Sequence, residues 1–155
     1  MKRIASFSVD HDKIKEGMYL SRVDGNVYTY DLRTRVPNNS DNDYMDNLTM
    51  HSVEHMAATY FRNSAYGDRV VYFGPMGCQT GFYLLLDGVK PAEALEITCE
   101  VFRKIAFEAE EMFGAERKEC GNYKNLSLSV AKAEAERYYK VLKSIENENL
   151  EYTKE

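Results

Sequence analysis

The sequence predicts an α+β fold, in which helices cover an antiparallel sheet within a single domain spanning residues 1–155. Two observations lead to this prediction. Strand-like segments come first along the chain, a helical segment interrupts them, two more strands follow, and two helices close the chain. This order is typical of an antiparallel sheet covered by helices and differs from a doubly wound parallel fold. In addition, 155 residues, of which 44% are apolar, are enough for one ordinary hydrophobic core.

Alternating apolar and polar residues predict the strands in the first third of the chain. Residues 4–10 alternate and are expected to form a half-buried strand, and residues 18–23 a second one. The clearest strand is 27–36, whose apolar face alternates with a polar face that includes Arg33. Because the turn-forming residues 24–26 separate the last two strands, we expect an antiparallel hairpin.

The remaining elements follow from helical spacing and from turn residues. Strands are predicted at residues 69–73 and 81–87, on either side of a Gly- and Pro-containing turn. Helices are predicted at residues 48–64, 91–113 and 128–145. Asp46 or Asn47 is expected to cap the first helix, and Gly114 to end the second. The charged residues 146–155 are expected to form a frayed tail.

Composition and charge exclude several classes of partner. The formal net charge is −5 and no block of Lys and Arg occurs, so nucleic acid and anionic membranes are poor candidates. The longest apolar run covers only residues 82–86, far short of the ~20 residues of a transmembrane helix. After the first three residues, polar residues at positions 6, 8, 10 and 11 interrupt the apolar stretch that a signal peptide needs, so we expect no signal peptide and a cytoplasmic location.

Two of the chain's three histidines lie four residues apart in the segment HSVEH, which spans His51 to His55. On a helix that advances ~100° per residue, His51, Glu54 and His55 share one face. Val53, Met56, Ala57 and Tyr60 lie on the opposite face and can pack on the sheet. Such a histidine pair suits a shared metal ion, with Glu54 placed as a nearby base. A solvent-exposed polar face is the alternative interpretation.

The three cysteines, Cys78, Cys99 and Cys120, do not indicate a disulfide framework, because their number is odd and no export signal is expected. Cys99 lies on an apolar helix face and is expected to fill the core. Cys78 lies in the Gly-rich turn GPMGCQTG, which can present a thiol to a cleft. Cys120, in a polar link between helices, could complete a His/His/Cys metal set that leaves a position open for substrate. For both cysteines, a purely structural role is the alternative.

Taken together, five segments in the same order resemble the S-ribosylhomocysteine lyase family, the LuxS-type enzymes. They are SFSVDH (6–11), YDLR (30–33), HSVEH (51–55), GPMGCQTGFY (74–83) and CGNY (120–123). The resemblance covers nearly the whole chain. It implies metal-dependent cleavage of S-ribosylhomocysteine into homocysteine and 4,5-dihydroxy-2,3-pentanedione, the precursor of autoinducer-2.

The resemblance also implies a role for individual residues. His51, His55 and Cys120 would hold one divalent metal, ferrous iron in the cell and often zinc after purification. Glu54 and Cys78 would transfer protons, with Arg33 stabilising charge beside them. The residues implied in substrate binding are Ser6, Phe7, His11, Arg33, Tyr72 and Gly77. The family forms homodimers with sites at the interface, so the segment from Ser6 to His11 is expected to serve the partner's site.

The chain departs from the family pattern at two positions before the cysteine turn. Where the family often has aspartate and then serine two residues later, this chain has Tyr72 and Gly74. The family aspartate helps to hold the amino-acid end of homocysteine, so that anchor is missing here. The metal and proton-transfer residues are all present.

Two other functions are compatible with parts of this pattern. A metallopeptidase of the His-x-x-Glu-His type would use Glu54 to activate water and a downstream glutamate, such as Glu119 or Glu134, as its third ligand. This interpretation leaves Cys78 without a role. A non-catalytic metal-binding or redox-sensing homologue would use Cys78 as an oxidisable thiol.

Overall fold

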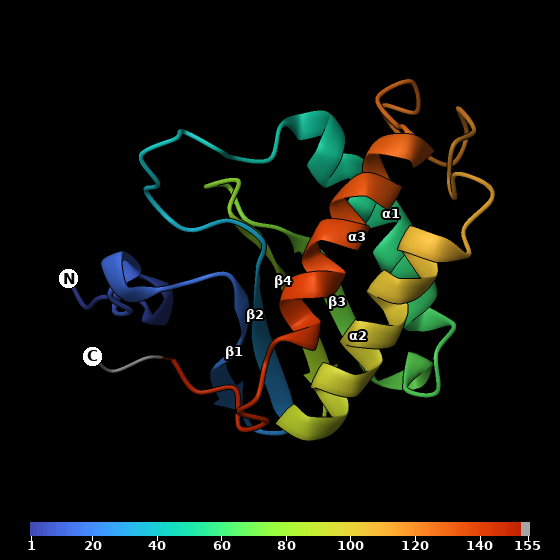
Figure 1. The fold of residues 1–155 in the computed structure, drawn as a ribbon. Helices are drawn as coiled ribbons and strands as arrows, with labels where there is room; N and C mark the ends of the chain where they lie inside the picture. The colour runs from blue at the N-terminus through green and yellow to red at the C-terminus, as the bar shows by residue number, and fades with distance from the viewer. Residues whose placement is uncertain (153–155) are drawn as a thin grey trace.

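The computed structural model describes residues 1–152 (Figure 1). These residues form a four-stranded antiparallel sheet and three helices. The strands are β1 (Gly17–Asp24), β2 (Val27–Arg33), β3 (Val70–Pro75) and β4 (Gly81–Asp87), in the spatial order β1-β2-β4-β3. The helices are α1 (Asn47–Arg62), α2 (Pro91–Phe107) and α3 (Leu128–Lys143). Short 3-10 turns cover Ala5–Phe7, His11–Lys13 and Gly67–Arg69. The predicted α+β class is therefore confirmed.

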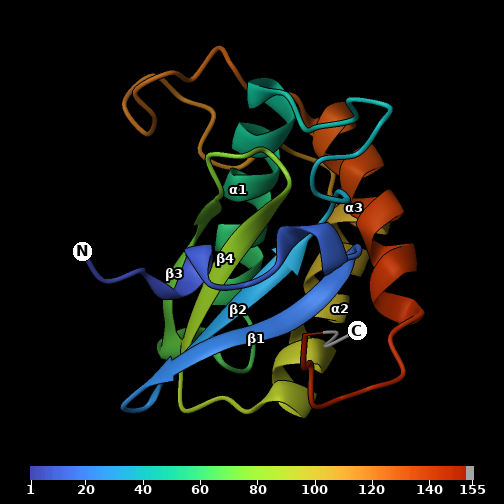
Figure 2. The same ribbon diagram turned by 90° about the vertical axis from the view of Figure 1, so that its left-hand side faces the viewer.

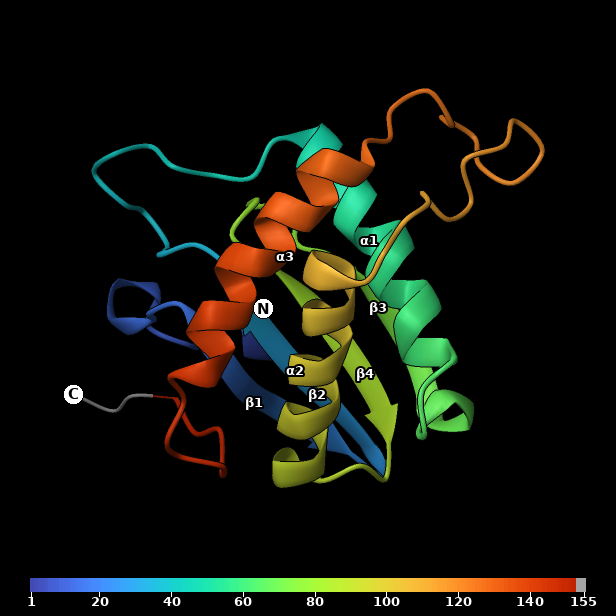
Figure 3. The ribbon, with the colours of Figure 1, turned by 45° about the vertical axis from the view of Figure 1, so that its right-hand side comes forward.

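The three helices lie side by side on one face of the sheet (Figure 3). The core lies between these two layers and includes the fully buried Tyr30 and Leu32 of β2 and Phe82 of β4. Figure 2 shows the opposite face, which the N-terminal segment crosses. In the part of the chain that the structure describes, no helix combines the length and apolar character needed to span a bilayer.

The start of α1 follows the prediction and determines which way its histidines face. The carboxylate of Asp46 accepts a hydrogen bond from the Thr49 N–H at 2.8 Å and caps the helix. Val53, Met56 and Ala57 are buried against the rest of the core, as predicted. Because these side chains fix the rotation of the helix, the opposite face, which carries the two histidines, is left only partly buried.

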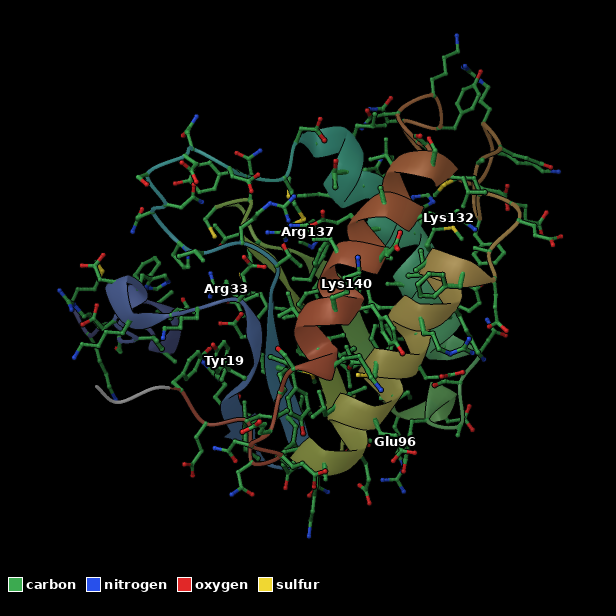
Figure 4. All side chains as sticks on the ribbon, viewed as in Figure 1. Tyr19, Arg33, Glu96, Lys132, Arg137 and Lys140 are labelled. Carbon is green, nitrogen blue, oxygen red and sulfur yellow. The ribbon has the colours of Figure 1, made fainter. Side chains whose placement is uncertain are left out.

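Strand β2 is buried on both faces at its end, although one of these faces is polar, as predicted. Asp31 and Arg33 point away from the helices, yet their side chains are only 1% and 3% exposed. Figure 4 shows Arg33 on this side, together with Tyr19 of β1. The strand also ends at Arg33 rather than residue 36, because the N–H groups of the next two residues both bind the Thr80 carbonyl, at 2.9 and 3.0 Å.

The predicted strand at residues 4–10 is wrong. This segment forms the two 3-10 turns instead, because its backbone groups bond locally: the Ser8 N–H binds the Ala5 carbonyl at 3.0 Å. The Asp10 carboxylate caps the second turn by accepting the Asp12 N–H at 3.1 Å. Alternation over so few residues does not make a strand without a neighbouring strand to bond with.

Helix α2 ends at Phe107, six residues earlier than its apolar spacing predicts. The Ala109 N–H still binds the Lys104 carbonyl at 2.9 Å, and the Ala109 carbonyl then accepts the Lys132 ammonium of α3 at 2.6 Å. The chain leaves the helix there and forms a long loop, residues 108–127, that runs beside the first half of α1 (Figure 3). The early end of α2 therefore supplies the loop that faces the two histidines.

The C-terminal tail also differs from the frayed segment that its charge predicts. After α3, the Leu150 carbonyl accepts a hydrogen bond from the Leu20 N–H on the free edge of β1, at 2.7 Å. The Leu150 side chain is 2% exposed and belongs to the core. Two residues later, the Tyr152 ring stacks on Tyr19, with ring centroids 4.8 Å apart. The tail is thus held against the sheet through residue 152, and the last three residues of the expected frayed segment lie outside the described residues.

Candidate metal centre and acid–base residues

The structure brings together His51, His55 and Cys120, although Cys120 lies 69 positions after His51 in the sequence. One ligand atom from each of His51, His55 and Cys120 lies within 4.8 Å of the others. The Cys120 sulfur lies 3.4 Å from Nε2 of His51, and the two imidazole rings meet edge to face with centroids 4.6 Å apart. Helix α1 supplies both histidines and the 108–127 loop supplies the thiol, so the cluster depends on the contact between these two segments.

Backbone carbonyls of the same loop orient both histidine rings. Nδ1 of His51 lies 2.8 Å from the Asn125 carbonyl oxygen, and Nδ1 of His55 lies 3.0 Å from that of Phe113. A carbonyl oxygen only accepts, so each Nδ1 carries the proton and donates. Each Nε2 is then unprotonated and available as a ligand, which is the arrangement that orients histidines in metal sites.

Gly114 fits closely against His55 in this arrangement. Its φ of +67° lies in the left-handed region, which glycine adopts without strain. A β-carbon at this position would lie 2.7 Å from Nδ1 of His55, closer than such contacts occur. The sequence suggests Gly114 as a helix end, but the structure shows it as the residue that lets the Phe113 carbonyl reach His55.

Gly114→Ala is expected to weaken metal binding about 10- to 100-fold, as is usual when a partner that orients a metal ligand is lost. The new methyl group would push the loop away from His55 and break the bond to the Phe113 carbonyl. Competition for zinc against a chromogenic chelator measures the affinity. Gly121→Ala is the matched control, because its β-carbon would meet nothing within 4 Å. Equal affinities for the two variants would contradict this role of Gly114.

Glu54 borders the cavities on both sides of the histidines. One cavity, of about 230 Å³, is lined by His51 and Glu54 together with Pro75, just before the cysteine turn. The other is lined by Glu54 and His55 with residues of the 108–127 loop. A carboxylate in this position can exchange protons with a molecule bound at the cluster.

The second thiol, Cys78, is exposed and lies beside a buried cation. Nη1 of Arg33 is 4.0 Å from the Cys78 sulfur, and it donates a hydrogen bond to the Thr80 hydroxyl at 2.7 Å. The same hydroxyl lies 3.0 Å from the Cys78 sulfur. A guanidinium and a hydroxyl beside the sulfur can stabilise negative charge that develops on it during a reaction.

Arg33 is itself held by a two-point contact with Asp31. Its Nε and Nη2 donate to the two carboxylate oxygens at 3.0 and 2.6 Å. Burial opposes the charge of Arg33, but the Asp31 carboxylate outweighs this effect, so the pKa of Arg33 lies above its ordinary value. The cross-strand neighbours of Arg33 are Gly17 and Gly81, which leave room for the large side chain.

The residues implied in substrate binding come from the N-terminal segment, from β2 and β3 and from the turn between β3 and β4. Ser6 and Tyr72 line an open groove with a volume of about 420 Å³. Phe7 is 69% exposed, and Nδ1 of His11 lies 2.9 Å from the Val9 carbonyl oxygen. Gly77 has open space where a side chain would be. Of these residues, none lines the described cavities that adjoin the histidine–cysteine cluster.

The two departures from the family pattern are linked in space. A β-carbon on Gly74 would lie 1.9 Å from the Tyr72 hydroxyl oxygen, so the phenol ring lies where the side chain of residue 74 would be. Any larger residue at position 74 would displace Tyr72. The tyrosine and the glycine therefore fit against each other and form one linked difference rather than two independent ones.

The glutamates proposed as ligands of a metallopeptidase have other partners. Glu134 binds both terminal nitrogens of Arg35 in a buried ion pair, one at 3.0 Å. The Glu119 carboxylate accepts the Glu116 N–H at 3.1 Å. The third donor next to the histidines is the Cys120 sulfur. The site therefore differs from the two-histidine, one-glutamate set of that peptidase class.

The sequence did not indicate five residues that contact the predicted site residues, which are Asp31, Thr80, Phe113, Gly114 and Asn125. Asp31 and Arg33 lie two residues apart on one strand face, so their contact could have been predicted from spacing. The carbonyls of Phe113 and Asn125 leave no signal in the sequence, because every residue carries a carbonyl.

Comparison with known proteins agrees with the geometry. The family model described as "S-Ribosylhomocysteinase (LuxS)" matches residues 4–149. A protein named S-ribosylhomocysteine lyase from Borreliella afzelii is 41% identical over 158 residues, covering 98% of this chain and 99% of that protein. Proteins of the same name from Desulfotalea psychrophila, with 44% identity over 98% of this chain and 99% of that protein, and Phocaeicola vulgatus, with 42% identity over the full length of both, are also similar. The chain therefore belongs to the S-ribosylhomocysteinase, or LuxS, family.

Proposed function

We propose that this protein is a carbon–sulfur lyase that cleaves S-ribosylhomocysteine into homocysteine and 4,5-dihydroxy-2,3-pentanedione. The observation that carries the proposal is the convergence of His51, His55 and Cys120, with their ligand atoms within 4.8 Å, in a chain of the LuxS family. The similar proteins named S-ribosylhomocysteine lyase match almost the whole length of this chain.

The donor set fits a divalent metal. Two imidazole nitrogens, freed by Nδ1–H bonds to backbone carbonyls, and one thiolate suit both ferrous iron and zinc. We propose ferrous iron as the native metal, as the family resemblance implies, with zinc as a substitute. Bound there, the metal would supply Lewis acidity to the carbonyl and hydroxyl oxygens of the substrate.

The proton transfers fall to Cys78 and Glu54. After ring opening, the sugar carries its carbonyl on the first carbon, and this carbonyl must move to the third. Each move needs one group to remove a proton from carbon and a group to return a proton to its neighbour. The Cys78 thiolate and the Glu54 carboxylate can exchange these roles through enediolate forms of the sugar. With the carbonyl on the third carbon, a last proton removal expels the homocysteine thiolate by β-elimination.

Arg33 supports this chemistry through its fixed charge. Its guanidinium lies 4.0 Å from the Cys78 sulfur and is held by Asp31, so it can favour the thiolate between proton transfers. Thr80 adds a hydroxyl at 3.0 Å from the same sulfur. We propose two roles for Arg33: it supports proton transfer by Cys78, and it also contacts the substrate.

A homodimer completes the proposal. Ser6, Phe7 and His11 lie on the outer sheet face, and none of them lines the described cavities at the subunit's own cluster. We propose that they reach the site of a second subunit, where Tyr72 and Gly77 also contact substrate. Both functional thiols must stay reduced, so the proposal includes a cytoplasmic location.

Release of free thiol from S-ribosylhomocysteine by the anaerobically prepared, iron-loaded protein is the expected result. A colorimetric thiol reagent measures it, and protein stripped with a chelator is the control. No thiol release from the loaded protein would contradict the lyase and favour a binding or sensing role. Cleavage of peptides without thiol release would support the metallopeptidase instead.

A further inference from the structure

We propose that Tyr152, in the C-terminal tail, is a positioning residue that maintains the reactivity of Cys78 through Asp31 and Arg33. The inference rests on the proposed function for its meaning in catalysis. The contacts that carry it are independent of any substrate, however, and can be tested without one.

The hydroxyl of Tyr152 reaches the ion pair that supports Cys78. It donates a hydrogen bond to Oδ2 of Asp31 at 2.7 Å, and the same oxygen accepts Nη2 of Arg33 at 2.6 Å. From the other side of the guanidinium, Nη1 lies 4.0 Å from the Cys78 sulfur. A continuous series of contacts therefore joins the tail to the exposed thiol.

The tail holds Tyr152 in place by contacts on both faces of the sheet. Leu150 adopts a left-handed φ of +55°, buries its side chain in the core and accepts the Leu20 N–H on the β1 edge. This change of direction carries the next residues around the edge strand. The Tyr152 ring then lies 4.8 Å from that of Tyr19, nearly parallel to it, over the outer face. These contacts hold the Tyr152 side chain in a fixed position beside Asp31.

Besides Arg33, Tyr152 is the only side chain among the described residues that hydrogen-bonds to the Asp31 carboxylate. Tyr19 of β1, Tyr83 of β4 and Tyr138 of α3 lie near enough for the Asp31 charge to raise the pKa of their phenols as well. Burial raises the pKa of all four tyrosines, and for Tyr152 the nearby Asp31 charge raises it further. Tyr152 therefore stays protonated and remains a donor at neutral pH.

The hydroxyl affects Cys78 in two ways that act in the same direction. By donating to Asp31, it takes up part of the carboxylate charge that would otherwise neutralise Arg33. It also fixes the carboxylate in the orientation that binds the guanidinium at two points. Both effects keep positive charge at the edge of Arg33 that faces the sulfur, which favours the thiolate.

The test measures alkylation of Cys78 by iodoacetamide in the zinc-loaded protein, without substrate. Peptide mass spectrometry separates Cys78 from Cys99 and Cys120. In Tyr152→Phe, which keeps the ring on Tyr19, the rate at neutral pH is expected to fall about three- to tenfold, since one hydrogen bond to a charged group is lost. The alkylation rates of the variant and the wild type are expected to become equal at alkaline pH, because Cys78 is then deprotonated in both proteins.

Tyr30→Phe is the matched control. It also removes one buried hydroxyl, which donates to the Val89 carbonyl at 2.6 Å and touches neither Asp31 nor Arg33. An alkylation profile of Tyr152→Phe that matches wild type would overturn the proposal. So would a decrease that persists at alkaline pH or appears equally in Tyr30→Phe, because either result indicates general loosening. If alkylation changes as expected but the iron-loaded wild-type protein releases no thiol from S-ribosylhomocysteine, the coupling of Tyr152 to Cys78 stands and only the lyase function fails.

Discussion

Cys120→Ala is expected to abolish both metal binding and thiol release. The sulfur is the one donor of the cluster that comes from outside α1, 3.4 Å from Nε2 of His51. Without it, two histidines on one helix face remain, and a pair of imidazoles without a thiolate binds ferrous iron and zinc far more weakly. Metal analysis of the purified variant should show little bound metal, and thiol release should fall to the level of the chelator-treated protein.

Cys99→Ala provides the control for this experiment. Cys99 lies partly buried on α2, packed against the core, and burial raises the pKa of its thiol. Its removal should leave the metal content and the activity near those of wild type. A Cys120→Ala protein that keeps its full complement of metal would show that Cys120 is not a ligand.

Cys78→Ala is expected to keep the metal and to lose turnover. Removing a group that transfers protons to and from carbon typically costs about 10²- to 10⁴-fold in rate. The metal should remain because no contact joins Cys78 to the three ligand atoms, and its neighbours are Arg33 and Thr80. Thiol release from S-ribosylhomocysteine and metal analysis on the same preparation measure the two effects.

Comparison of the two cysteine variants separates the roles of the two thiols. A hydroxyl is too weak an acid to replace a thiolate, so Cys78→Ser should be nearly as inactive as Cys78→Ala. If Cys78→Ala lost the metal while Cys120→Ala kept it, the two assignments would have to be exchanged. Full activity in Cys78→Ala would remove it from the mechanism and leave Glu54 as the only proton carrier.

Local pattern was sufficient for most of the fold. Strand β4 spans residues 81–87 as predicted, and α1 begins with the Asp46 cap that its sequence indicates. These elements depend on alternation, helical spacing and capping, all of which act over a few residues. The alternating segment at residues 4–10 shows the limit of such reasoning, because a strand also needs a partner with free backbone groups.

The candidate site was predicted as a set of residues, and the structure supplied their arrangement. The spacing of His51 and His55 already placed two imidazoles on one helix face, and the resemblance named Cys120 as the third donor. Whether Cys120 reaches them depends on where α2 ends and how the 108–127 loop returns to α1. A long loop is positioned by contacts between distant residues, which spacing along the chain does not describe.

The sequence by itself determined the chemical types at the site: a histidine pair with a glutamate, two separate thiols and an arginine on a strand. Only the tertiary structure decided which of these groups are buried, which carbonyls orient the histidines, and that Tyr152 of a tail expected to fray reaches Asp31. The physical reason is that donor chemistry belongs to single residues. Orientation and charge compensation arise from contacts between segments far apart in the chain, so they exist only after the sheet, the helices and the tail have packed together.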